Sequence, residues 1–132
     1  MLRDPARVRT IAVLFGGAVG SLLRVGAARL VPPDPGQWPW ATFAANLAGT
    51  LVLAWLVTRL TEAMPPTRYW REFLGTGFCG ALTTFSTFQV ETIDIAQEGS
   101  PATAAGYAAA SLVAGMAIAA AATVAARRRR YA

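Results

Sequence analysis

Long apolar stretches separated by short polar links dominate the chain. A helix that crosses a membrane needs about 20 mainly apolar residues. Four segments are long and apolar enough, and they cover residues 10–31, 40–60, 70–96 and 102–126. The links at 32–36 and 65–66 contain prolines that end a helix, and Pro101 suits a first helical turn. The pattern predicts an all-α membrane protein, with residues 1–132 forming a single four-helix transmembrane domain.

The third segment is the least apolar, and its residues argue against one continuous helix. Gly77 and Gly80 precede a cluster of four hydroxyl side chains in residues 83–87. Glycine and threonine are poor helix formers, so we expect a break near residues 80–83 and a helix that resumes from about Thr84. Non-helical backbone at membrane depth occurs only where protein or a water-filled path surrounds it. Broken helices are also where transporters bind ions.

Two polar side chains in the first two segments need partners. Gly16, Gly20 and Arg24 are each four residues apart, so they share one helix face. A face of small residues favours packing against protein, and Arg24 either meets a partner there or extends to the membrane surface. Thr42 and Asn46 share a face of the second segment in the same way. The Asn46 amide either bonds across helices or lines a polar path.

The amino-acid composition argues against a soluble domain and against an enzyme. Hydrophobic residues make up 55% of the chain and charged residues 14%, against about 25% charged in typical soluble domains. The net charge is +5, but the long uncharged stretches favour lipid over nucleic acid as the partner. The chain has no histidine and one cysteine. An enzyme is therefore disfavoured, because the hydroxyl side chains lack a histidine or lysine to activate them.

The arginines lie mostly on one side of the predicted membrane domain. With four spans, both termini and the middle link share that side. It holds ten of the twelve arginines, which are Arg3, Arg7, Arg9, Arg59, Arg68, Arg71 and residues 127–130. Positive residues favour the cytoplasmic side. We therefore expect a multi-pass protein of the cell (inner) membrane with cytoplasmic N- and C-termini.

Taken together, these motifs resemble the Fluc (CrcB) family of fluoride ion channels over essentially the whole chain. The glycine pair and arginine of residues 17–24 resemble the family's first-helix motif. Residues 42–49 resemble its threonine–asparagine–glycine motif. Residues 77–88, followed by Glu91, are similar to its longer signature in the third helix.

This resemblance implies an antiparallel dimer of four-helix subunits with two narrow pores. It also implies a structural sodium ion at the dimer centre, held by the backbone carbonyls of Gly80 and Thr83 in each subunit. Backbone oxygens are suitable ligands for a hard cation. The implied activity is fluoride-specific and passive: fluoride leaves the cell down its gradient, which lowers its cytoplasmic concentration.

The resemblance also assigns the remaining polar and aromatic residues. It places Asn46, Phe85, Phe88, Ser86, Thr87, Tyr107 and Ser111 along the fluoride path. Arg24, Thr42 and Glu91 would be structural or would line a vestibule, with Glu91 as a candidate partner of Arg24. Amide and hydroxyl groups are donors that can replace the water around fluoride, and aromatic ring edges carry partial positive charge.

Both the identity of the dimer partner and the function of the chain have alternative interpretations. A homodimer built antiparallel needs one sequence to insert both ways, so the arginine bias favours an oppositely oriented paralogue as partner over a homodimer. A small four-helix proton-coupled multidrug exporter is the alternative function. It would want a carboxylate in the first span, where this chain has arginines. An assembly subunit that does not itself transport is a third interpretation.

Overall fold

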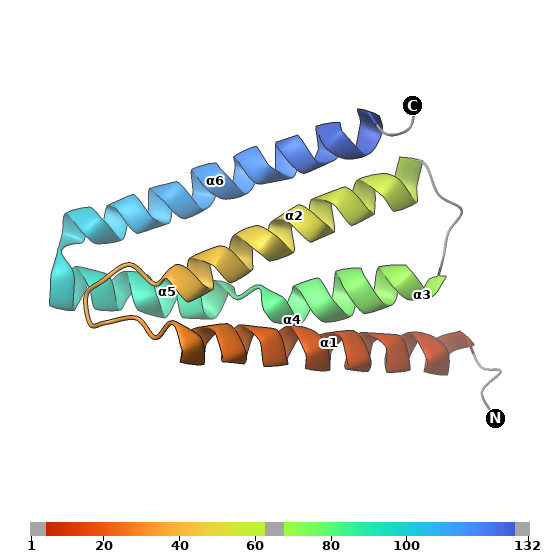
Figure 1. The fold of residues 1–132 in the computed structure, drawn as a ribbon, viewed down its shortest axis with the longest axis horizontal. Coiled ribbons are helices and arrows are strands. Elements are labelled where there is room, and N and C mark those ends of the chain that lie inside the picture. Colours follow the sequence, from red (N-terminus) through yellow and green to blue (C-terminus); the bar gives the residue numbers. More distant parts are fainter. Residues whose placement is uncertain (1–4, 63–67, 129–132) are drawn as a thin grey trace.

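The computed structural model describes residues 5–62 and 68–128, and within these ranges all regular structure is helical (Figure 1). Three helices are long, and a row of five short helices lies between the second and third of them. The helices are α1 (Pro5–Leu30), α2 (Trp40–Glu62), α3 (Arg68–Trp70), η1 (Arg71–Cys79), α4 (Gly80–Leu82), α5 (Phe85–Asp94), η2 (Ile95–Gly99) and α6 (Pro101–Arg128).

The long helices agree with the predicted apolar segments, but the third segment differs. By length and composition, α1, α2 and α6 can each cross a membrane. In the third segment, the chain is helical over residues 68–82 and 85–99, and between these runs it leaves the helical conformation at Thr83 and Thr84. Two of its pieces, η1 and η2, are π-helices, which have wider turns than an α-helix and often lie at functional sites.

The long helices and the third segment run in alternating directions along the long axis of the molecule, which is horizontal in Figure 1. The start of α1, the end of α2, the start of α3 and the end of α6 therefore lie at the same end, which we call the arginine-rich end. It includes the described arginines Arg7, Arg9, Arg59, Arg71, Arg127 and Arg128. Arg3, Arg129 and Arg130 lie outside the described residues, as does the side chain of Arg68.

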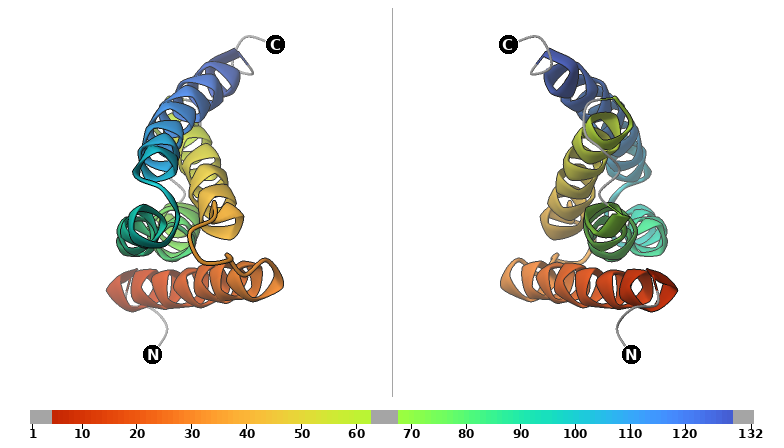
Figure 2. Two further views of the ribbon diagram at one scale, coloured as in Figure 1. Left: turned by 90° about the vertical axis from the view of Figure 1, so that its left-hand side faces the viewer. Right: turned by 90° about the vertical axis from the view of Figure 1, so that its right-hand side faces the viewer.

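The third segment lies between α1 on one side and the pair of α2 and α6 on the other (Figure 2). Glycines allow α1 and η1 to touch through their backbones. A Cβ atom at Gly16 would overlap the carbonyl oxygen of Phe73, and one at Gly20 would overlap that of Phe78. Both glycines are buried. The prediction that the small face of the first helix packs against protein is therefore confirmed.

Replacing Gly16 should separate these two helices. We expect Gly16→Ala to lower the free energy of unfolding by roughly 1–3 kcal/mol, because the added methyl overlaps backbone atoms that cannot rotate away. The measurement is thermal unfolding of the purified protein in detergent. Gly26→Ala is the matched control in the same helix, since a Cβ at Gly26 meets nothing within 4 Å. Equal unfolding midpoints for the two variants would contradict the proposed backbone contact.

Candidate functional site

The break in the third segment is short and sharply defined. Thr83 has ψ 150° and Thr84 has φ −147° and ψ 123°, so both residues are extended. The helix before them ends at Leu82 and the next one begins at Phe85. The predicted break is therefore confirmed, but it lies at Thr83 and Thr84, because Gly80–Leu82 are still helical, and the next helix begins one residue later than expected.

Asn46 of α2 bonds to the break through both ends of its amide. Its Nδ2 donates to the carbonyl oxygen of Thr84 at 3.1 Å, and the backbone N–H of Thr84 donates to its Oδ1 at 2.8 Å. In an unbroken helix this N–H would donate to the carbonyl oxygen of Gly80. The Gly80 carbonyl has therefore lost its helical donor. Of the two roles considered for Asn46, the structure shows the bond between helices.

Arg24 of α1 holds the other side of the break. Its Nε donates to the carbonyl oxygen of Ala81 at 3.0 Å, which in an unbroken helix would accept from the N–H of Phe85. The guanidinium thus lies at the C-terminal end of the helical run that ends at Leu82. Positive charge is favoured there by the helix dipole. Arg24 therefore makes a structural contact within the chain.

The prediction that Glu91 is a partner of Arg24 is wrong. Its Oε1 accepts a hydrogen bond from the Thr42 hydroxyl at 2.6 Å, and its Oε2 accepts one from the Tyr107 hydroxyl at 3.0 Å. Thr42 and Tyr107 are both buried, and hydrogen bonds to a carboxylate are stronger than neutral ones. Glu91 therefore joins α5 to α2 and α6.

Aromatic rings form a row that starts just after the break. The ring centroids of Phe85 and Phe88 are 5.9 Å apart, and those of Phe88 and Tyr107 are 5.2 Å apart. Trp38 extends the row, with its ring centroid 5.3 Å from that of Tyr107. At the other end, Phe85 is 71% exposed. The structure thus brings together three of the predicted path residues, Phe85, Phe88 and Tyr107.

Trp38 is not among the residues predicted for the fluoride path. It lies in the link before α2, and it reaches Tyr107 only because that link folds onto α6 and packs on the buried cluster of Ile95, Ala104 and Tyr107. Its position beside Phe43 and Tyr107 depends on long-range packing. No local motif in the sequence signals this contact.

The hydroxyl groups at the start of α5 largely bond to one another. Thr84 caps the helix, because its Oγ1 accepts from the backbone N–H of Thr87 at 3.2 Å. The Thr84 hydroxyl also donates to Thr87 Oγ1 at 3.0 Å and lies 3.4 Å from Ser86 Oγ. Ser86 and Thr87 therefore lie next to the break, and Ser86 is exposed.

Three buried donors have no hydrogen-bond partner among the described residues: Ser111 Oγ, Trp38 Nε1 and Arg59 Nε. The first two lie beside the aromatic row. Ser111 is one helical turn from Tyr107 on the same face of α6, and Trp38 contacts the Tyr107 ring. Buried donors are normally paired, so both groups remain available to a ligand or to water next to the aromatic row.

The residues at Gly80 and Thr83 fit a cation held by backbone oxygens. The described residues contain no group of three or more acidic, cysteine or histidine side chains that could hold a metal ion. Gly80 is exposed, and its carbonyl has lost its helical donor. The N–H and the hydroxyl of Thr83 both donate back to the carbonyl oxygen of Cys79, at 3.0 and 2.9 Å. These donors are thereby directed away from the break.

Comparison with known proteins gives a consistent result. The family model described as "CrcB-like protein, Camphor Resistance (CrcB)" matches residues 11–123. A protein of Mycobacterium bovis named "Fluoride-specific ion channel FluC 1" is 46% identical over 90% of each chain. One of the same name from Mycolicibacterium paratuberculosis is 48% identical over 80% of each chain. "Fluoride-specific ion channel FluC" of Bordetella parapertussis is 40% identical over 90% of this chain and 93% of its own.

Proposed function

The chain belongs to the CrcB-like family, and we propose that it is a fluoride-specific ion channel that lowers cytoplasmic fluoride by passive export. The relatives' names carry this conclusion, because the similarity extends over most of the chain. A family of ion channels is not enzymatic. A proton-coupled multidrug exporter is not favoured, since the described part of α1 contains arginines and no carboxylate.

The proposed fluoride path follows the aromatic row. Fluoride is small and strongly hydrated, so a path must offer hydrogen-bond donors or positive ring edges in place of water. Phe85, Phe88 and Tyr107 supply the rings, and the unpaired donor of Ser111 lies one turn further along α6. Neutral groups bind an anion firmly enough to admit it and weakly enough to release it.

Asn46, Ser86 and Thr87 complete the proposed path at the helix break. The Asn46 amide carries two N–H groups, and the bond to Thr84 accounts for one of them. The second N–H is our candidate donor to fluoride. Ser86 and Thr87 supply hydroxyls in the first turn of α5, directly beside Phe85.

A structural sodium ion at Gly80 and Thr83 is part of this proposal. Both carbonyls belong to the break, where Asn46 rather than the helix receives the Thr84 N–H. When bound, the ion would supply fixed positive charge close to an anion path. The residues of the chain itself hold the break open, through Asn46 on one side and Arg24 on the other.

We also propose an antiparallel dimer of subunits that each cross the membrane four times, with the broken segment as the third crossing. One chain leaves Phe85 71% exposed and Gly80 exposed beside the break, so a second subunit is needed to enclose this region. The arginine-rich end favours a single orientation with cytoplasmic termini in the inner membrane. An oppositely oriented paralogue is therefore the favoured partner, and a homodimer is the alternative.

Removing the aromatic edges should stop conduction. We expect Phe85→Ile combined with Phe88→Ile to abolish fluoride efflux from liposomes, because isoleucine has no positive ring edge. Efflux is measured with a fluoride electrode, and chloride efflux is recorded in parallel as the test of selectivity. Phe15→Ile is the matched control, since Phe15 is 66% exposed on α1. Full fluoride efflux in the double variant would remove these rings from the path.

If the dimer consists of this chain and an oppositely oriented paralogue, fluoride efflux should depend on the presence of that paralogue. Liposomes that contain this chain alone should release no fluoride, and co-reconstitution with a paralogue of opposite arginine bias from the same organism should restore release. Fluoride efflux from the chain alone would contradict the dimer with a paralogue and favour the homodimer. Chloride release equal to fluoride release in the paired sample would contradict the proposed selectivity itself.

A further inference from the structure

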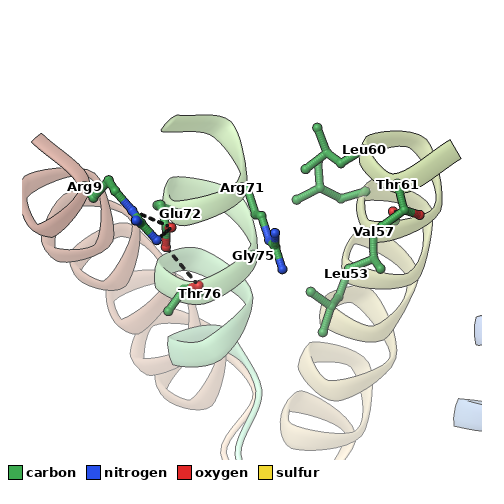
Figure 3. A pocket seen from close by; sticks show the side chains of 10 residues that line it. Arg9, Leu53, Val57, Leu60, Thr61, Arg71, Glu72, Gly75 and Thr76 are labelled. Carbon is green, nitrogen blue, oxygen red and sulfur yellow. Dashed lines mark hydrogen bonds and ion pairs between the residues drawn. The ribbon is translucent and has the colours of Figure 1, made fainter. Parts of the chain in front are cut away.

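A cleft of about 540 Å³ opens between α2 and η1 at the arginine-rich end. One wall is apolar and consists of Leu53, Leu56, Val57 and Leu60 of α2. Figure 3 shows Leu53, Val57 and Leu60 facing η1, and shows Arg71 pointing from η1 toward them. The cleft therefore combines a hydrocarbon-like wall with a positive charge.

The charge of Arg71 is not balanced within the described part of the chain. Glu72, the next residue, also lines the cleft, but its carboxylate turns toward Arg9 of α1 (Figure 3). Its Oε1 accepts from Arg9 Nε at 2.9 Å and from Arg9 Nη2 at 2.6 Å, and Thr76 bonds to its Oε2 at 3.4 Å. Arg9 thus neutralises Glu72. Arg71 is exposed and has no ion pair among the described residues.

The depth of the cleft fits the surface of a membrane. Tyr69 and Trp70, just before Arg71 in the chain, are 50% and 57% exposed, and such aromatic residues favour the headgroup region. The positive-inside rule places the arginine-rich end in the cytoplasmic leaflet, which contains anionic lipids that attract basic residues.

From this geometry we propose that the cleft binds one anionic phospholipid. The lipid phosphate pairs with the Arg71 guanidinium, whose planar donor groups match phosphate oxygens. One acyl chain lies along the leucine wall of α2. The site is separate from the aromatic row, because its residues come from the opposite end of α2 and from η1.

Native mass spectrometry of the purified channel with equimolar phosphatidylglycerol and phosphatidylcholine tests this site. The wild-type protein should retain phosphatidylglycerol in preference. Arg71→Gln should reduce its occupancy by about fivefold, the effect of removing one arginine near an anionic headgroup. Arg128→Gln, a neutral substitution at an exposed arginine on α6 at the same end, should keep the wild-type preference.

A second variant tests the apolar wall. A Cβ at Gly75 lies 3.8 Å from the Leu53 and Leu56 side chains, so Gly75→Leu should fill the cleft and remove binding of both lipids, whereas Gly75→Ala should not. Unchanged phosphatidylglycerol binding in Arg71→Gln would overturn the proposal. It would also be overturned if Gly75→Leu left lipid binding intact and converted dimers to monomers, because a second subunit would then occupy the cleft.

Discussion

The structure depends on how a backbone that leaves the helix inside a membrane finds hydrogen-bond partners. Each unpaired backbone group in hydrocarbon costs several kcal/mol, so a broken helix is stable only if protein groups replace the missing bonds. Asn46 supplies both a donor and an acceptor to Thr84, and Arg24 supplies a donor to Ala81. The Gly80 carbonyl is left without its helical donor, as a backbone cation site requires.

The position of the aromatic row follows from the same break. Thr84 caps α5 through its hydroxyl, and the helix then places Phe85 and Phe88 three residues apart, so that their rings stack. Glu91, one turn further on, ties α5 to α2 and α6 through Thr42 and Tyr107. The break and the rings are therefore held by contacts from α1, α2 and α6 together, although all of these contacts lie within one chain.

Much of this arrangement could be predicted from the sequence. The long apolar segments, the break after Gly80 and the small face of the first helix all arise from local composition or helical spacing. The partners of Glu91 could not be predicted, because Thr42 and Tyr107 are distant in the sequence and meet it only through helix packing. The same reason explains the missed contact of Trp38 with Tyr107. The break in the third segment is predicted, and its place at Thr83 and Thr84 reflects where Asn46 and Arg24 lie.

An experimental structure of the channel in lipid nanodiscs with sodium present tests the central claim most directly. The account predicts extended residues at Thr83 and Thr84, an Asn46 amide bonded to the Thr84 backbone, and cation density beside the carbonyl oxygens of Gly80 and Thr83. A continuous helix from Gly80 to Phe88, with the Thr84 N–H bonded to the Gly80 carbonyl, would contradict it.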